Sequence, residues 1–176
     1  MIGMEGRTLK SKRLSFRLLE DGDKASLFRI LQEEETTVPS GFLPIADRNT
    51  FEVFWKRLTQ YNTAIAILYR GECIGYFHVN KWVPEEAEYK DKKNIGIGFL
   101  IGKNYLRQGF GTETLTTLNQ YLLSQFDCIW GDYFEGNEAS KNLLNKCGFI
   151  PVGTYDMDFD TLGGEKRHIY SNVLTR

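Results

Sequence analysis

The stretch Tyr105-Leu106-Arg107-Gln108-Gly109-Phe110-Gly111-Thr112-Glu113 decides the fold of this chain, because it joins a predicted strand to a predicted helix. Glycine permits tight turns and the close approach of the backbone to a ligand. The helix is expected to begin near Thr112, and its first turn has unpaired N–H groups at the positive end of the helix dipole. Both features favour an anion, so the stretch predicts that the amides of residues 108–112 bind phosphate.

A second unit of the same kind follows downstream. Asn137 is a suitable N-cap for a helix that is predicted to end near Cys147, where Gly148 is expected to stop it in the left-handed conformation. Two glycines in a loop are weak evidence by themselves. The prediction therefore depends on both units, which occur in this order along the chain.

The composition fits one soluble domain that spans residues 1–176. Lys and Arg number 22 against 23 Asp and Glu, so the net charge of -1 gives no basic field for nucleic acid. No apolar run approaches the roughly 20 residues that span a bilayer, and residues 1–7 lack the apolar core of a signal peptide. We therefore expect a cytoplasmic protein with no membrane partner. The three cysteines lack C-x-x-C spacing and His168 has no second histidine nearby, which argues against a disulfide framework and a metal site.

Hydrophobic alternation and helical spacing predict the other elements. Strands are expected at residues 14–18, 64–69, 73–80, 95–101, 128–134, 152–159 and 167–174, and helices at residues 25–34, 49–58, 112–122 and 137–147. Residues 36–47 and 81–93 are expected to be loops, and residues 162–164 a turn. This order is typical of a mixed α/β domain and not of a regular βαβ alternation.

Several separated motifs together resemble the GNAT superfamily of acyl-CoA-dependent N-acetyltransferases. They are Phe99-Leu100-Ile101, Gln108-Gly109-Phe110-Gly111-Thr112-Glu113, Asn137-x-x-Ser140 and Gly148-Phe149. The opening Lys12-Arg13-Leu14-Ser15-Phe16-Arg17-Leu18 and the closing Ile169-Tyr170-Ser171 are similar to the RimJ/RimL-like subgroup, which acetylates the N-termini of ribosomal proteins. The resemblance covers nearly the whole chain. It implies a mostly antiparallel central sheet with a splayed strand pair, flanked by helices, and acetyl transfer from acetyl-CoA to an amine.

The resemblance also implies where acetyl-CoA binds. The amides of Gln108, Gly109, Phe110, Gly111 and Thr112 would hold the CoA diphosphate, and Arg107 either adds charge there or is a solvated side chain. The strand Phe99-Leu100-Ile101 would pair with the pantetheine arm as an added strand does. The amide of Ile101 would then face the thioester oxygen, where it stabilises the negative charge of the transition state.

Asn137 and Ser140 each have two interpretations. Asn137 either contacts pantetheine or only caps the helix. By resemblance, Ser140 donates a proton or a hydrogen bond to the departing sulfur, although serine is also common in first turns for capping reasons. Many relatives use a tyrosine one turn later, and this chain has Leu143-Leu144-Asn145 there, which shifts the weight onto Ser140.

The base that takes the proton of the acceptor amine is left open. Relatives often carry Glu where this chain has Gly96, so the resemblance supplies no base. The remaining candidates are Glu85, Glu86, Glu88, His78, Asp132 and Glu135. The acceptor is either a protein N-terminus or a small-molecule amine, the loops 36–47 and 81–93 are expected to frame its entrance, and the sequence does not decide between a monomer and a homodimer.

Two other folds place glycines between a strand and a helix, and both fit poorly. A dinucleotide-binding fold needs a small residue at Thr114 and a βαβ start, and a P-loop needs G-K-[ST] after the turn. A stronger alternative is a non-catalytic domain of the same fold that binds acyl-CoA as a sensor or interaction module. Gly96 keeps this alternative open, because a cofactor site can persist without catalytic groups.

Overall fold

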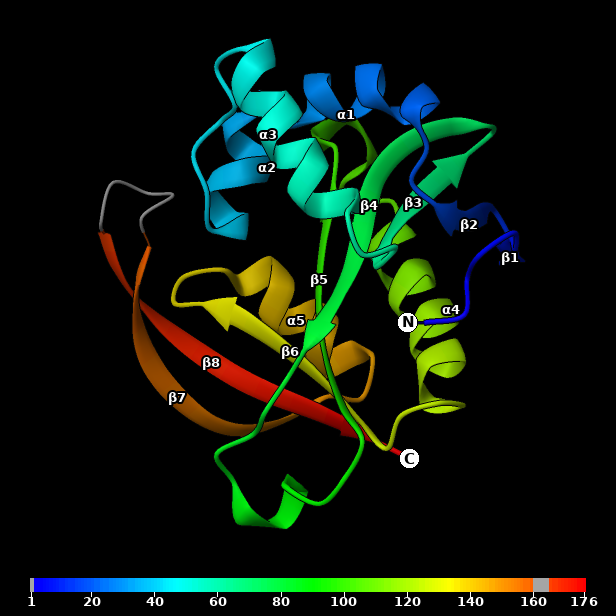
Figure 1. Ribbon diagram of the computed structural model, residues 1–176. Helices are drawn as coiled ribbons and strands as arrows, with labels where there is room; N and C mark the ends of the chain where they lie inside the picture. The colour runs from blue at the N-terminus through cyan, green and yellow to red at the C-terminus, as the bar shows by residue number, and fades with distance from the viewer. Residues whose placement is uncertain (1, 160–164) are drawn as a thin grey trace.

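The computed structural model describes residues 2–159 and 165–176, which form one eight-stranded sheet with helices on both faces (Figure 1). The strands are β1 (Leu9–Lys10), β2 (Leu14–Leu18), β3 (Ala64–Tyr69), β4 (Glu72–Lys81), β5 (Asn94–Ile101), β6 (Cys128–Phe134), β7 (Ile150–Phe159) and β8 (Glu165–Thr175). Their order in the sheet is β1-β2-β3-β4-β5-β6-β8-β7. Every neighbouring pair is antiparallel except β5 and β6, which run parallel. The predicted mixed α/β fold is confirmed.

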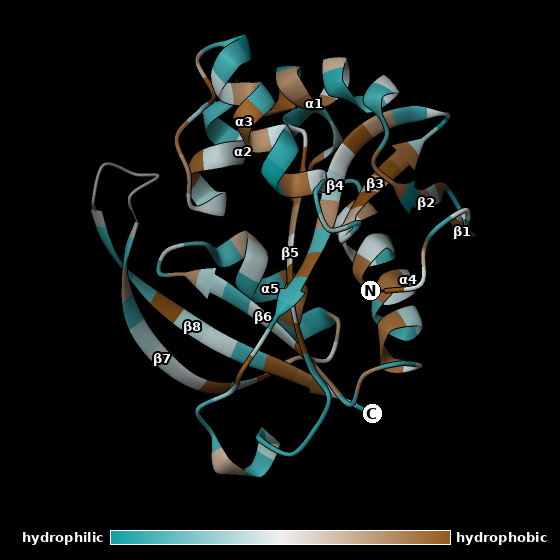
Figure 2. Ribbon diagram, in the orientation of Figure 1, coloured by the Kyte–Doolittle hydropathy of each residue, from teal (hydrophilic) through white to brown (hydrophobic). Residues whose placement is uncertain are grey.

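The helices divide between the two faces of the sheet. They are α1 (Lys24–Ile30), α2 (Glu34–Thr37), α3 (Arg48–Thr59), α4 (Phe110–Leu123) and α5 (Glu138–Lys146), with short 3-10 turns at Asp21–Asp23, Val38–Ser40, Ala87–Tyr89 and Lys103–Tyr105. Helices α1 and α3 pack with Ala66 and Leu68 of β3, whereas α4 and α5 pack with Ile65 and Ile67. Successive residues of a strand point to opposite faces, so this one strand contributes to both cores. Figure 2 shows the hydrophobic character of β3 and β4 between these layers.

The first predicted helix is wrong in its extent. The chain leaves the helix after Ile30, because the carbonyl of Leu31 accepts a hydrogen bond of 2.8 Å from the N–H of Ile45 rather than from a later turn. A second short helix, α2, begins at Glu34 and extends into the segment that was expected to be a loop. The helical spacing of apolar residues continued through this break and did not reveal it.

Smaller differences concern other boundaries. Helix α4 begins at Phe110, two residues earlier than predicted, and Gly109 is its N-cap in the left-handed conformation with φ +81°. Strand β1 was not predicted, and Ala87–Tyr89 forms a 3-10 turn in an expected loop. Gly148 has φ +86°, as predicted for a left-handed helix stop. The predicted turn at residues 162–164 lies outside the described residues.

The parallel strands β5 and β6 separate partway along their length. They pair from Asn94↔Cys128 to Ile97↔Gly131, and no pairing continues beyond that point among the described residues. Strand β5 nevertheless stays paired with β4 as far as Ile101, and β6 stays paired with β8 as far as Phe134. The predicted splayed pair is therefore present, and it opens a gap in the middle of the sheet that positions the site below.

None of the helices in the described part of the chain has the length and apolar character that a membrane span requires.

Candidate active site

The turn before α4 presents a row of free amides. The N–H groups of residues 107–112 make no hydrogen bond to another described residue, and the first paired N–H is that of Glu113, which donates to the carbonyl of Gly109 over 3.1 Å. Arg107 and Gly109 both have left-handed φ angles, +57° and +81°. Alternating left- and right-handed residues gather successive N–H groups around a concave surface that binds anions. The helix dipole of α4 adds positive potential at the same place.

The β1–β2 hairpin braces this turn from behind through Arg13. Its guanidinium donates to Glu113 Oε2 over 2.7 Å and to the carbonyl of Gln108 over 3.0 Å, and it lies 4.3 Å from the centre of the Phe110 ring. Ser11 Oγ donates to the other oxygen of Glu113 over 2.7 Å. The Gln108 side chain donates to the carbonyl of Asn104 over 2.8 Å and the Phe110 side chain is buried, and neither residue lines the cavity described next.

A first cavity of about 840 Å³ extends from this turn to the end of β5 and the start of α5. Arg107, Gly109, Gly111 and Thr112 line it at one end, and Phe99 and Ser140 line it at the other. Gly111 serves helix packing there, because a Cβ atom would lie 2.9 Å from Leu143 Cδ2 of α5. The volume is within the range of ligand clefts, about 300–1,000 Å³.

The free edge of β5 faces this cavity. The N–H of Gly102 donates to the carbonyl of Ile74 in β4 over 2.9 Å. Because backbone groups alternate in direction along a strand, the N–H of Ile101 and of Phe99 point to the opposite edge, which β6 has left, whereas Leu100 points to β4. Two of the three predicted strand residues therefore offer unpaired backbone groups to the cavity.

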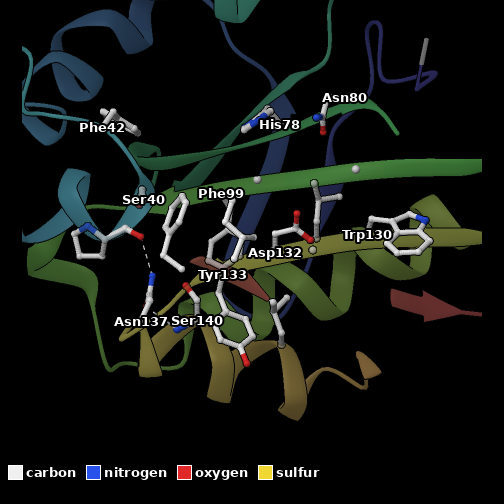
Figure 3. A pocket seen from close by; sticks show the side chains of 18 of the residues that line it. Ser40, Phe42, His78, Asn80, Phe99, Trp130, Asp132, Tyr133, Asn137 and Ser140 are labelled. Atoms are coloured by element: carbon white, nitrogen blue, oxygen red, sulfur yellow. Dashed lines mark hydrogen bonds between the residues drawn. The ribbon is translucent and has the colours of Figure 1, made fainter. Parts of the chain in front are cut away.

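Asn137 and Ser140 stand where the first cavity meets a second one (Figure 3). Asn137 Oδ1 accepts a hydrogen bond of 3.0 Å from the N–H of Ser140, and its Nδ2 donates to the carbonyl of Pro39 over 2.8 Å. Asn137 Oδ1 therefore caps α5, and Nδ2 connects the start of this helix to the loop that contains Pro39. Ser140 Oγ has no hydrogen-bond partner among the described residues, so this hydroxyl is available to a ligand at the junction.

The second cavity, of about 410 Å³, lies on the other side of the split. Aromatic side chains from β4, β5, β6, β7, α3 and two loops form much of its wall: Phe42, Phe54, Tyr76, Trp82, Phe99, Trp130, Tyr133, Phe134 and Tyr155. Gly96 and Gly98 lie in its floor. A Cβ atom on Gly96 would lie 2.6 Å from Asn80 Oδ1 and 3.1 Å from Trp82, so a glutamate at this position would have to displace these side chains.

Only two of the predicted base candidates, His78 and Asp132, line this cavity; Glu85, Glu86, Glu88 and Glu135 do not. Burial lowers the pKa of His78, whose Nδ1 is buried without a hydrogen-bond partner, so the imidazole is neutral at pH 7. Burial raises the pKa of Asp132, although Tyr155 Oη donates to it over 2.5 Å and Ser171 Oγ over 3.0 Å. Nothing in the sequence indicated these two partners or the aromatic walls, because they meet only in the folded sheet.

Metal and thiol chemistry have little support in the described part of the chain. It contains no cluster of three His, Cys, Asp or Glu side chains that could hold a metal ion. Cys73 and Cys128 are buried, Cys147 is half-buried, and all three are free. Burial raises the pKa of Cys73 to about 12, so this thiol is not an activated nucleophile.

The sequence profile of the acetyltransferase (GNAT) domain family matches residues 13–150. The chain belongs to the GNAT acetyltransferases. It is therefore an acyltransferase that depends on acetyl-CoA, as the motifs predicted, and it acts on an amine acceptor. No match was found among curated protein sequences.

Solved structures support the same fold for this GNAT acetyltransferase. A GNAT-family acetyltransferase from Bacillus anthracis has 14% identity and a TM-score of 0.78, with 96% of this chain and 98% of that chain covered. Spermidine N-acetyltransferase from Vibrio cholerae, in complex with CoA and spermine, has 14% identity, a TM-score of 0.73 and coverage of 94% and 96%. Mycobacterium smegmatis RimJ, in complex with CoA-disulfide, has 16% identity, a TM-score of 0.72 and coverage of 92% and 81%. At these identities the likeness shows the fold alone.

Proposed function

We propose that this GNAT acetyltransferase transfers the acetyl group of acetyl-CoA directly to a primary amine, and that it belongs to the RimJ/RimL-like subgroup. The acceptor is a protein N-terminal α-amine or a small-molecule amine. One observation carries the proposal: one continuous cavity is lined by the turn that holds the free amides, through Arg107, Gly109, Gly111 and Thr112, by the open edge of β5, and by Ser140, whose hydroxyl has no partner among the described residues.

The residues of the first cavity fit acetyl-CoA along its length. The free amides accommodate the diphosphate, and the exposed Arg107 side chain adds a positive charge at the mouth. The N–H and carbonyl groups of Phe99 and Ile101 pair with the amides of pantetheine as a neighbouring strand would. When bound, acetyl-CoA supplies the acetyl group as a thioester. The N–H of Ile101 then stabilises the charge that develops on the thioester oxygen.

Ser140 is suited to assist the leaving sulfur. It is the third residue of α5, so its hydroxyl lies near the positive end of the helix dipole, where a thiolate is stabilised. The hydroxyl donates a hydrogen bond or a proton to the sulfur. No residue of the site forms a covalent bond with the acetyl group, so transfer is direct.

The subgroup proposal is supported by the opening and closing motifs and by the fold shared with Mycobacterium smegmatis RimJ. The fold shared with spermidine N-acetyltransferase keeps small polyamines among the acceptors. The alternative is a non-catalytic acyl-CoA sensor. A sensor would need neither the free Ser140 hydroxyl nor a second cavity beside the first one. We therefore favour the enzyme.

The test is thiol release from acetyl-CoA in the presence of spermidine, benzylamine, or peptides with a free N-terminal Ala or Ser. The enzyme is expected to release CoA with at least one class of amine, and Ser140→Ala to slow that release. Ser124→Ala is the control, because Ser124 lies outside both cavities at the end of α4. Acetyl-CoA binding without release by any amine would support the sensor.

A further inference from the structure

Asp132 is a partly buried carboxylate that forms no ion pair within the described part of the chain. Its two oxygens accept hydrogen bonds from the hydroxyls of Tyr155 and Ser171, and no Lys, Arg or His pairs with it among the described residues. Glu86 also carries a negative charge and raises the pKa of Asp132 further. Burying an anion without a counter-ion is unfavourable, so such a group is usually retained for a ligand or a reaction.

The fold places this carboxylate at the point where β5 and β6 separate. Gly131 is the last residue of β6 that pairs with β5, and Asp132 follows it directly. Figure 3 shows the Asp132 carboxylate directed from β6 toward β5, with His78 beyond β5 on β4. Asp132 lines the second cavity together with Phe99 and Ser140, and these two residues also line the first cavity.

The surroundings of Asp132 favour a positive charge. Among the described residues that line the second cavity there is no Lys or Arg, and Asp132 is the only carboxylate. The walls present aromatic rings, including Tyr76, Trp82 and Tyr133. A ring face attracts an ammonium group by about 0.5–2 kcal/mol, depending on desolvation. A cavity that combines one anion with aromatic walls is selective for an organic cation.

We propose that Asp132 binds the ammonium group of the acceptor and removes its proton, and that the acceptor is a cationic primary amine with an apolar or aromatic body. This inference rests on the proposed function. The step is a simple proton transfer: one N–H bond of the ammonium breaks, an O–H bond forms on a carboxylate oxygen, and the nitrogen keeps the electron pair with which it attacks. The carboxylate becomes neutral, and the amine becomes a neutral nucleophile.

Tyr155 and Ser171 act as positioning residues for this carboxylate. They come from β7 and β8, the two strands beyond β6, and fix the rotation of the carboxyl group toward the cavity. Their hydrogen bonds lower the pKa of Asp132 against the larger effect of burial, and Glu86 raises it. The neutral His78 on β4 faces the same cavity, so the charge of the site is negative. Tyr155→Phe should therefore raise the pKa of Asp132 and move the acid limb of kcat/KM to higher pH, which a merely structural role would not do.

The decisive comparison is Asp132→Asn against Asp156→Asn. Asp156 pairs with His168 on the exposed β7–β8 ribbon and lies outside both cavities, so it controls for the loss of one carboxylate. We would measure the binding of benzylamine and of benzyl alcohol, its neutral analogue, to protein saturated with CoA. Wild type and Asp156→Asn are expected to bind benzylamine at least tenfold more tightly than benzyl alcohol, and Asp132→Asn is expected to lose this preference. For amines that the enzyme acetylates, Asp132→Asn should lower kcat/KM by about 10²-fold or more.

Equal binding of the two compounds by wild type, or a preference that survives in Asp132→Asn, would overturn the inference. Calorimetry with acetyl-CoA separates this outcome from a failure of the proposed function. If acetyl-CoA binds to wild type and to Asp132→Asn alike while the cation preference is missing, only the assignment of Asp132 fails. If acetyl-CoA does not bind to wild type, the assignment of the first cavity to acetyl-CoA fails, and the proposed function fails with it.

Discussion

Replacing Thr112 by proline removes one N–H group from the turn of residues 107–112, which is proposed to bind the CoA diphosphate, and changes little else. Thr112 is the third residue of α4, and the first N–H that pairs within the helix belongs to Glu113. Proline fixes φ near −65°, which matches a helix, and in the first turn it removes no intrahelical hydrogen bond. The preceding residue is Gly111, whose missing side chain reduces the clash that proline causes with its neighbour. The variant is therefore expected to fold.

The expected magnitude follows from the lost hydrogen bond. A neutral donor that binds a charged acceptor contributes about 1.5–3 kcal/mol, so removing the Thr112 N–H should weaken CoA binding by about 10- to 150-fold. Thr112→Ala keeps the N–H and removes the side chain, so it should bind CoA as wild type does. The difference between the two variants isolates the amide.

Calorimetric titration of CoA and of pantetheine provides the assay. Pantetheine lacks the diphosphate, so Thr112→Pro should bind it with unchanged affinity while its affinity for CoA falls. Circular dichroism and thermal unfolding check that both variants are folded. A folded Thr112→Pro that binds CoA as tightly as Thr112→Ala would refute the assignment of this turn.

Three further perturbations test other parts of the structure. Ser140→Ala should lower kcat at least tenfold with unchanged acetyl-CoA affinity, measured by steady-state kinetics and calorimetry, and equal losses in both would identify a structural role. Gly98→Ala places a Cβ atom 2.3 Å from His78 Cε1 and should destabilise the protein by about 1–3 kcal/mol in urea unfolding, with most of the loss recovered in the Gly98→Ala/His78→Ala double variant. Glu113→Gln should lose about 1–2 kcal/mol at pH 7. Burial raises the pKa of Glu113, but hydrogen bonds from Ser11 and Arg13 outweigh it and hold the pKa below its ordinary value of 4.5. The wild-type advantage should therefore be complete above pH 5 and disappear as the pH falls through the lowered pKa, and a pH-independent difference would contradict this.

The local features of the fold were predictable because local physics fixes them. The left-handed Gly148 and the N-cap Asn137 depend on residues within one helical turn. The strands followed from alternating hydrophobic residues, and the free amides of residues 107–112 followed from the start of a helix after glycine. None of these features needs a distant partner.

Other features depend on segments that meet only in space. The helix ends after Ile30 because the N–H of Ile45 donates to the carbonyl of Leu31. In a longer helix this carbonyl would accept a hydrogen bond from the next turn. The close packing of Gly111 against Leu143 of α5, 2.9 Å from where a Cβ atom would lie, is a contact that the local sequence does not reveal. Arg13 binds Glu113, which lies 100 residues further along the chain, and so supports the turn of residues 107–112. A pattern of neighbouring residues in the sequence cannot predict such a distant contact.

The sequence by itself determined the family, the acyl donor and the turn that is proposed to bind it, because glycine conformation and unpaired helix amides are properties of a short segment. The tertiary structure decided that only two of the six candidate bases, His78 and Asp132, line the second cavity. Asp132 stands out because burial and the hydroxyls of Tyr155 and Ser171 act on it across three strands. Desolvation depends on what surrounds a group in space, and the order of residues along the chain does not contain that information.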